Sequence, residues 1–345
     1  MMNKFIPYAH QLVTEQDIKA VSDILRGDWL TTGPTIERFE AAFAERHGAR
    51  YAVAMSSCTA ALHAAMLYLQ RGILRVFVPA ITFTATANAV LYAGVRPYFE
   101  DVRRDTLTIA IGASGINVAV EYAGYKLEVG AIFDKAHGCG NLHSGLISCY
   151  SFHPVKHITT GEGGMLTTDS QEIADFARRF RNHGMDSTGD MIDLGYNYRM
   201  TDMQAALGLS QLATLDERIA RRREIATAYN SVFGGISQIE IMPYPVSASV
   251  WHLYPIRLHL DKLTVTRDQF RDTLKQRGIG TQVHYRPVYY HPYYERLGYK
   301  RGLCPVAEAE YERLVSLPMW YGMTDEDVER VIKVVTDVCS EYARA

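Results

Sequence analysis

The chain has 345 residues, 48% of them hydrophobic, and its 36 basic and 38 acidic residues give a formal net charge of −2 at pH 7. This length suffices for one large core and a smaller domain, and the balanced charge argues against a nucleic-acid-binding surface or an acidic tail. No apolar run reaches the roughly 18 residues of a membrane-spanning helix, and the N-terminal MMNKFIPYAH lacks the pattern of a signal peptide. The cysteines are odd in number, scattered and without metal-ligand spacing: Cys58, Cys139, Cys149, Cys304 and Cys339. We therefore expect a soluble cytoplasmic protein.

Two helices are predicted before the first strand. The first begins after Thr14, which forms a capping box with Asp17, and it ends at Gly27. The apolar residues on one face of this helix are Ile18, Val21, Ile24 and Leu25. The second helix runs from about Ile36 to His47, and the loop between the two helices, residues 28–34, is rich in turn residues.

From Tyr51 onward, short apolar runs alternate with helical patterns. The predicted strands are 51–54, 76–78, 97–99, 117–120, 131–133, 147–150 and 164–167, and the helices among them are 59–69 and 84–92. This alternation predicts an α/β fold with a mostly parallel sheet that helices cover on both faces. In such folds, ligands bind at the loops beyond the carboxyl ends of the strands.

The later part of the chain predicts a second, smaller α+β unit. Thr201 and Gln204 form a capping box for a helix that continues to about Phe233. The elements expected after it are a strand at 250–259, a helix at 266–277, a strand at 280–285 and a last helix from residue 324. We expect two domains, a large one of residues 1–233 and a small one of residues 234–345.

Lys156, in the segment SFHPVKHITTGEGG, follows a buried-looking strand and precedes a glycine-rich turn. Desolvation lowers the pKa of such a lysine, and its amine then attacks an aldehyde more readily. The alternative is a surface lysine in a loop. Asp134, at the end of an earlier strand, could pair with a protonated pyridine nitrogen, and His137 could contact the ring beside it. The alternative for this pair is a capping Asp and a buried core His.

Two other strand-to-helix loops carry suitable residues. Ser57 and Thr59, in SSCTAAL, lie where backbone N–H groups and hydroxyls could bind a phosphate, although Ser57 could equally be an ordinary helix cap. Phe83, in ITFTATANAV, could stack on a planar ring or could belong to the core.

Taken in order, ten blocks of the chain resemble the DegT/DnrJ family of sugar aminotransferases that depend on pyridoxal 5′-phosphate (PLP). The most specific are SFHPVKHITTGEGG and GYNYRMTDMQAALG. The others are IPYAHQLVTEQDIKAV, GDWLTTGP, SSCTAALHAA, VPAITFTATANAVLYAG, FDKAHG, RNHGM, HLYPI and QVHYRPVYYHPYY. The resemblance covers nearly the whole chain and implies the fold type I architecture of PLP-dependent transferases, which is that of aspartate aminotransferase.

The resemblance also implies roles for single residues. Lys156 would bind PLP through a Schiff base, Asp134 would pair with the pyridinium, and His137 stands where the family has Gln or His. Phe83 would stack on the ring. The phosphate would be held by Ser57, Cys58, Thr59 and Ser151, and by Asn197 of the neighbouring subunit of a homodimer with shared sites. The nucleotide sugar would contact Tyr8, Trp29, Thr31, His284 and Tyr285, and Arg199 would help to bind glutamate.

Three segments, SFHPVKHITTGEGG, LGLSQL and QVHYRPVYYHPYY, are similar to the branch of the family that acts in pseudaminic acid biosynthesis. That similarity implies transfer of an amino group from L-glutamate to C4 of a UDP-linked 4-keto-6-deoxy-N-acetylhexosamine.

The chain also departs from the family. The stretch between Asp101 and Asp134 is short and lacks room for a helix, the loop from Ala136 to Ser148 is compact, and Lys135 replaces a small residue. The shortening could expose a face of the sheet.

Three alternatives remain open on the sequence. A sugar dehydratase of the same superfamily would carry His at the position of Lys156. A cofactor-free binding or regulatory protein would fit the shortened segment but not the retained Lys156 and Asp134. A metal hydrolase that used His284 and His291 would lack a carboxylate ligand at suitable spacing.

Overall fold

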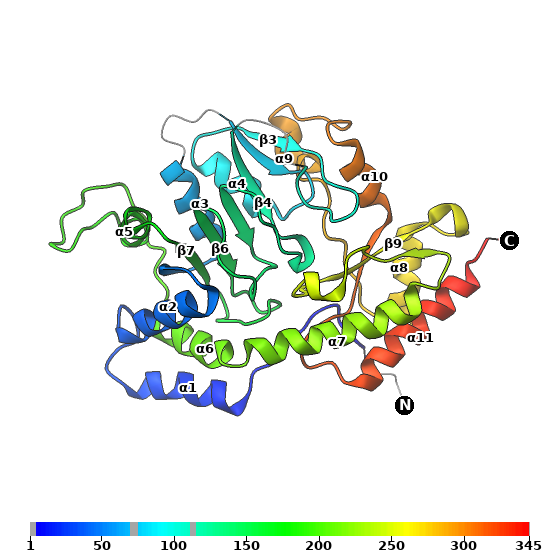
Figure 1. Cartoon of the computed structure of the whole chain (residues 1–345), viewed down its shortest axis with the longest axis horizontal. Helices are drawn as coiled ribbons and strands as arrows, with labels where there is room; N and C mark the ends of the chain where they lie inside the picture. The colour runs from blue at the N-terminus through cyan, green and yellow to red at the C-terminus, as the bar shows by residue number, and fades with distance from the viewer. Residues whose placement is uncertain (1–4, 70–74, 111–114, 345) are drawn as a thin grey trace.

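The computed structural model describes residues 5–69, 75–110 and 115–344. A seven-stranded sheet has the order β1-β7-β6-β5-β4-β2-β3 (Figure 1). Its strands are β1 (Tyr51–Met55), β2 (Val76–Pro79), β3 (Pro97–Glu100), β4 (Ile116–Val120), β5 (Ile132–Lys135), β6 (Ile147–Ser151) and β7 (Gly164–Thr168). Only β7 runs antiparallel to its neighbours, and the remaining pairs are parallel. The predicted mostly parallel α/β sheet is confirmed.

The helices of the first part of the chain are α1 (Glu15–Arg26), α2 (Pro34–His47), α3 (Cys58–Leu69), α4 (Thr84–Tyr92) and α5 (Gln171–Phe180). Both residues of the predicted Thr14–Asp17 capping box bond as expected. The apolar face of α1 is not buried, however, because Ile18 is 49% and Leu25 is 59% exposed. The sequence had not predicted α5, which follows the cap residue Ser170.

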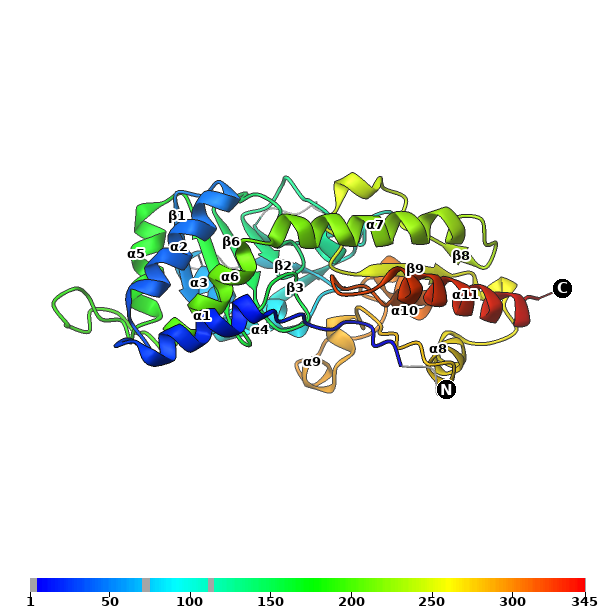
Figure 2. The same cartoon turned by 90° about the horizontal axis from the view of Figure 1, so that it is seen from below.

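The long helix predicted from residue 201 is two helices, α6 (Asp202–Leu212) and α7 (Leu215–Phe233). The break lies at Thr214, whose φ of −107° and ψ of 10° leave the helical region. It allows α6 to pack against α1 and α2 while α7 continues toward the second sheet, as Figure 2 shows. A uniform helical period in the sequence does not reveal such a change of direction.

The second sheet has three antiparallel strands in the order β10-β9-β8: β8 (Ile239–Glu240), β9 (Tyr254–Leu258) and β10 (Leu314–Leu317). The accompanying helices are α8 (Arg267–Gln276), α9 (Pro292–Arg296), α10 (Pro305–Arg313) and α11 (Asp325–Glu341). The strand predicted at 250–259 is shorter than expected, and the one predicted at 280–285 is only a single bridge from Gln282 to Ser316. Ile6 bridges to Ile279 of this part of the chain, so the N-terminal segment contacts residues of both predicted domains.

No α-helix separates β4 from the parallel strand β5, as the short sequence between Asp101 and Asp134 predicted. The connection consists of a 3₁₀ turn (Tyr122–Gly124) and a loop that bridges at Tyr125 to Ser249. The side chains of Val118 and Phe133 are nevertheless fully buried. The two strands therefore stay covered without the helix.

A buried ion pair lies beside this connection. Lys135 Nζ is 2.9 Å from Glu121 Oε1, and both side chains are completely buried. Asn141 Nδ2 donates to the other carboxylate oxygen at 2.7 Å, and Lys135 Nζ also donates to the carbonyl of Leu142. The unusual lysine next to Asp134 thus links the ends of β4 and β5 to the following turn.

Among the described residues, no helix is both long enough and apolar enough to cross a membrane.

Candidate active site

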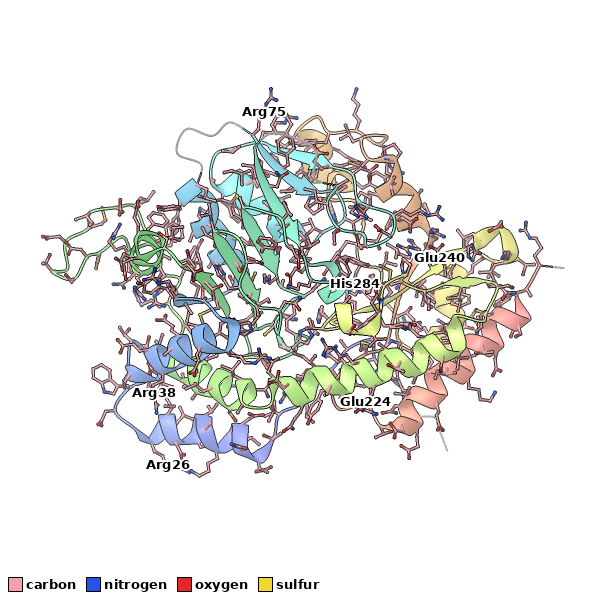
Figure 3. All side chains as sticks on the ribbon, viewed as in Figure 1. Arg26, Arg38, Arg75, Glu224, Glu240 and His284 are labelled. Atoms are coloured by element: carbon pink, nitrogen blue, oxygen red, sulfur yellow. The ribbon has the colours of Figure 1, made fainter. Side chains whose placement is uncertain are left out.

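A cavity of about 720 Å³ lies beyond the carboxyl ends of β5 and β6. The predicted site residues that line it are Tyr8, Ser57, Cys58, Thr59, Phe83, Asp134, His137, Ser151, Lys156, His284 and Tyr285. They come from separate segments of the chain, and Figure 3 shows His284 between the larger sheet and β9. Parallel strands gather the loops at their carboxyl ends, and this brings residues far apart in sequence to one place.

Lys156 lies in the turn between β6 and β7, five residues after the last residue of β6. The pKa of its amine is lowered to about 8, mainly by burial and also by Arg222, while Asp134 and Cys58 act in the opposite direction. The charged amine is disfavoured because it has left water. About a tenth of this lysine is therefore uncharged, and so nucleophilic, at pH 7.

Asp134 is buried at the end of β5 and receives two hydrogen bonds. Thr86 Oγ1 donates to Oδ2 at 2.7 Å, and the N–H of Ala136 donates to Oδ1 at 3.0 Å. Burial raises the pKa of the carboxyl, and these two donors and Lys156 counteract the rise. The carboxylate is thus held by two donors in a buried place, where a cationic partner would gain most from it.

The imidazole of His137 is hydrogen-bonded at both nitrogens. The N–H of Ala123 donates to Nδ1 at 3.3 Å, so Nε2 carries the proton and donates to the hydroxyl oxygen of Tyr285 at 2.8 Å. Burial holds the pKa of His137 well below its usual range, and nearby Lys156 acts in the same direction. A neutral His137 therefore supports Tyr285, whose own hydroxyl proton is left to donate into the cavity.

The loop before α3 also lines the cavity. Ser57 Oγ accepts from the N–H of Ala60 at 3.1 Å, so Ser57 caps the helix, as the simpler interpretation of the sequence held. Cys58 and Thr59 begin the helix and line the cavity with it. A Cβ on Gly164 would lie 2.3 Å from the carbonyl carbon of Ser57, so only glycine allows β7 to approach this loop. The N-terminal end of α3 suits an anion.

These groups fit PLP, the cofactor that the sequence resemblance implies. Lys156 offers an amine for the aldehyde, Asp134 offers a carboxylate for the pyridine nitrogen, and the start of α3 with Ser151 offers donors for the phosphate. Phe83 lies at the cavity with 60% of its surface exposed, and a flat ring could cover it.

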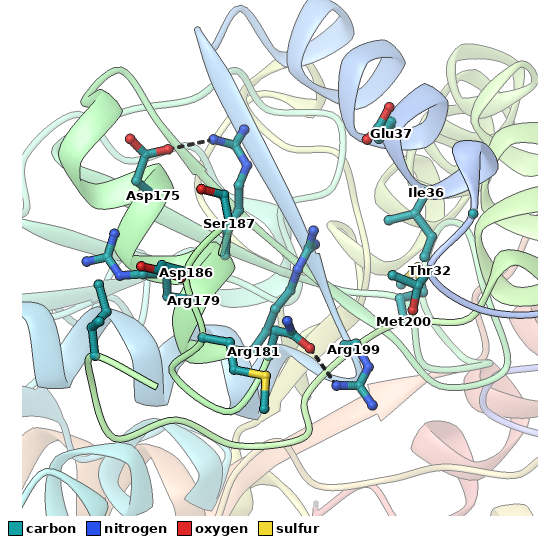
Figure 4. A pocket seen from close by; sticks show the side chains of 15 residues that line it. Thr32, Ile36, Glu37, Asp175, Arg179, Arg181, Asp186, Ser187, Arg199 and Met200 are labelled. Atoms are coloured by element: carbon teal, nitrogen blue, oxygen red, sulfur yellow. Dashed lines mark hydrogen bonds and ion pairs between the residues drawn. The ribbon is translucent and has the colours of Figure 1, made fainter. Parts of the chain in front are cut away.

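Four predicted site residues lie outside this cavity within one chain. Asn197 and Thr31 are exposed, and Trp29 is 57% exposed. Arg199 lines a second cavity of about 530 Å³, shown in Figure 4, and its Nη1 donates to Asn182 Oδ1 at 2.7 Å. The fold of a single chain therefore does not bring these four to Lys156.

The second cavity contains several arginines whose charges are already paired. Arg178 Nη1 is 3.0 Å from Asp175 (Figure 4), Arg179 Nε is 3.1 Å from Asp193, and Arg181 contacts Glu40. Such pairing leaves little attraction for a further anion. The cavity of Lys156 is thus the better candidate for catalysis.

Two residues of the site were not predicted from the sequence. Thr86 bonds to Asp134, and His252 places Nε2 3.4 Å from Lys156 Nζ. His252 belongs to the block HLYPI, which was noted only as part of the resemblance. The block gives no signal of contact with Lys156, because the two residues are 96 positions apart.

Comparison with known proteins agrees with this site. The sequence model of the DegT/DnrJ/EryC1/StrS aminotransferase family matches residues 11–123 and 119–336. The two matches meet at the end of β4, where the chain is short. Spore coat polysaccharide biosynthesis protein SpsC of Bacillus subtilis is 35% identical over 382 residues, with 97% of each chain covered. An uncharacterized protein of Methanocaldococcus jannaschii is 35% identical over 381 residues, with 98% of each covered.

Solved structures show the same architecture. Helicobacter pylori PseC, an aminotransferase involved in the biosynthesis of pseudoaminic acid, has a TM-score of 0.92 and 29% identity, with 98% of this chain and 100% of that chain covered. The putative sugar aminotransferase Spr1654 of Streptococcus pneumoniae, solved in its PLP form, has a TM-score of 0.90 and 27% identity, with 98% of this chain and 99% of that chain covered. The predicted fold type is confirmed.

Proposed function

The chain belongs to the DegT/DnrJ/EryC1/StrS aminotransferase family, and we propose that it transfers the amino group of L-glutamate to C4 of a UDP-linked 4-keto-6-deoxy-N-acetylhexosamine. As a member of this family, it is a PLP-dependent sugar aminotransferase. The observation that carries the proposal is one cavity that contains both the amine of Lys156 and the carboxylate of Asp134. Support for the sugar comes from the likeness to PseC and from Tyr8, His284 and Tyr285, which line the same cavity.

The residues of the chain would divide the work as follows. Bound PLP supplies an electron sink for the bond that breaks at the amino acid's Cα. Lys156 holds the cofactor covalently and, once released, moves the proton from Cα of the donor with its Nζ. Asp134 keeps the pyridine nitrogen protonated, and Ser57, Thr59 and the N-terminus of α3 bind the phosphate.

After glutamate has left as 2-oxoglutarate, the amino group would replace the oxygen of the sugar ketone, which leaves as water, and the same proton transfers would run in reverse. Lys156 Nζ then returns a proton to the sugar carbon C4, so one residue acts as both base and acid in the two halves of the reaction. Tyr285, supported by His137, has a hydroxyl proton available to donate toward the cofactor or the sugar. The lysine at position 156 argues against the dehydratase alternative, which requires His there.

We also propose that the active unit is a homodimer with shared sites. Asn197 and Arg199 lie beside a projecting loop in which Met191, Ile192 and Leu194 are between 58% and 75% exposed (Figure 1). Trp29 and the uncovered face of α1 add further exposed apolar surface. Exposed apolar patches of this kind mark association sites, and a closed two-fold pairing would let Asn197 reach the partner's phosphate site.

The five free, buried cysteines fit our further proposal that the enzyme acts in the cytoplasm.

A product assay tests the proposed reaction. The purified protein would be loaded with PLP and incubated with L-glutamate and a panel of UDP-linked 4-keto-6-deoxy sugars, and mass spectrometry would identify aminated products. We expect amination of an N-acetylated substrate and none with Lys156→Ala. Amination of sugars without the N-acetyl group only, or with a different nucleotide only, would contradict the substrate that we propose. Absence of PLP absorbance in the loaded protein would favour the cofactor-free binding protein.

A further inference from the structure

His252 is held firmly at the wall of the cavity. It follows Trp251 and precedes β9, and its ring is buried and lines the same cavity as Lys156. Its N–H donates to the carbonyl of Ala123 at 3.0 Å, and its carbonyl accepts from Arg222 Nη1 at 3.1 Å. Because the main chain is fixed on both sides, the ring has a defined place relative to Lys156.

The ring uses one nitrogen for Lys156 and leaves the other unpaired. Its Nε2 is 3.4 Å from Lys156 Nζ. Its Nδ1 is buried and has no hydrogen-bond partner in the described part of the chain. A buried polar atom without a partner disfavours folding, and an apolar side chain would avoid this cost. The presence of imidazole here therefore indicates a use at the site.

Burial, together with the charges around this ring, keeps it neutral. Burial is the main reason that the pKa of His252 lies well below its usual range, and Lys156, His137, His157 and Arg222 each lower it further. The ring centroids of His137 and His157 are 4.4 and 5.6 Å away. A neutral imidazole has one acceptor nitrogen, and the lysine amine is a donor, so the contact at Nε2 requires the proton to be on Nδ1.

We propose that His252 is a positioning residue for the reaction, whose Nε2 accepts a hydrogen bond from Lys156 Nζ and orients that amine whenever it is not bound to the cofactor. The inference rests on the proposed role of Lys156. Attraction to Asp134 would otherwise draw the protonated amine toward the carboxylate that must remain free for the pyridine nitrogen. A neutral acceptor on His252 holds the amine without adding a competing charge.

Capture of PLP by the cofactor-free protein tests this role without turnover. His252→Phe keeps a ring of similar size and removes the acceptor, whereas His252→Gln keeps an acceptor that can reach Lys156. PLP would be added to each apo protein, and the rate of the absorbance change would be followed, together with thermal unfolding. We expect capture to slow about tenfold to a hundredfold in His252→Phe, because a misplaced nucleophile loses rates of this size. We expect His252→Gln to stay within about threefold of the parent.

The outcomes separate this inference from the proposed function. Borohydride reduction and peptide mapping of the parent must place the label on Lys156, and a label elsewhere would overturn the proposed function. If Lys156 is labelled but His252→Phe captures PLP as fast as the parent, only the role of His252 is wrong. Equal slowing in both variants at unchanged unfolding temperature would also refute it. If His252→Phe does not fold, the test uses His252→Asn instead. The asparagine amide is too short to reach Lys156, so PLP capture by this variant must again be slow.

Discussion

Replacement of Asp134 by Asn isolates the charge at the centre of the site. The amide has the same shape as the carboxylate, and its neighbours can accept it. The oxygen of the new amide would keep the hydrogen bond from the N–H of Ala136. Its nitrogen would donate to Thr86 Oγ1, whose hydroxyl can turn toward Thr82 Oγ1 at 2.8 Å. We therefore expect the variant Asp134→Asn to fold and to bind PLP.

The loss of charge should appear in the reaction rate. An ion pair about 4 Å apart at an effective dielectric constant of about 20 is worth about 4 kcal/mol. Part of this remains as a hydrogen bond, so we expect the rate of the glutamate half-reaction to fall about 10²- to 10³-fold. Stopped-flow absorbance with PLP-loaded protein measures it directly. Turnover close to that of the parent would refute the assignment of Asp134.

The stability of the apo variant Asp134→Asn should not fall as its reaction rate does. Burial raises the pKa of Asp134 in the folded state, so at neutral pH the unfolded state holds the ionised carboxylate more favourably. Removal of the charge should leave the unfolding temperature unchanged or higher. It should also lower the pKa of Lys156 below about 8, because Asp134 is the largest influence that raises it. A large drop in the unfolding temperature would show that Asn does not fit as argued.

Three further predictions concern the amine of Lys156, the buried pair of Lys135 and Glu121, and the proposed shared sites. The rate at which the apo protein captures PLP should rise with pH through about 8, because only the uncharged amine of Lys156 attacks. A capture rate independent of pH between about 6 and 9 would contradict this. Lys135→Met should lower the free energy of unfolding by about 3–5 kcal/mol, because Glu121 is left charged and buried. In denaturant titrations, the double variant Lys135→Met with Glu121→Gln should lose clearly less. Lys156→Ala and Asn197→Asp should each be inactive, yet subunit exchange between them should restore part of the activity, and inactive hybrids would refute shared sites.

Local elements follow from local sequence, and those predictions were the most accurate. The capping boxes at Thr14 and Thr201 specify where their helices begin, because the bonds that form them join residues only three positions apart. The strands of the larger sheet agree to within a residue or two, since most are short apolar runs buried along their length. Residues 280–285 were misassigned: Gln282 makes a single bridge to Ser316, and residues 282–285 line the cavity of Lys156 instead of continuing a strand.

The sequence by itself identified the family and the mostly parallel sheet, and it predicted Lys156 and Asp134 as members of one site, because those residues stand in dense motifs at strand ends. Only the tertiary structure decided that His252 contacts Lys156 and that Glu121 neutralises Lys135. It also separated Asn197 and Arg199 from the cavity of Lys156. Such relations depend on strand order and on the path of connecting loops. These are set by which apolar faces pack together over long sequence separations, and no local pattern of residues records them.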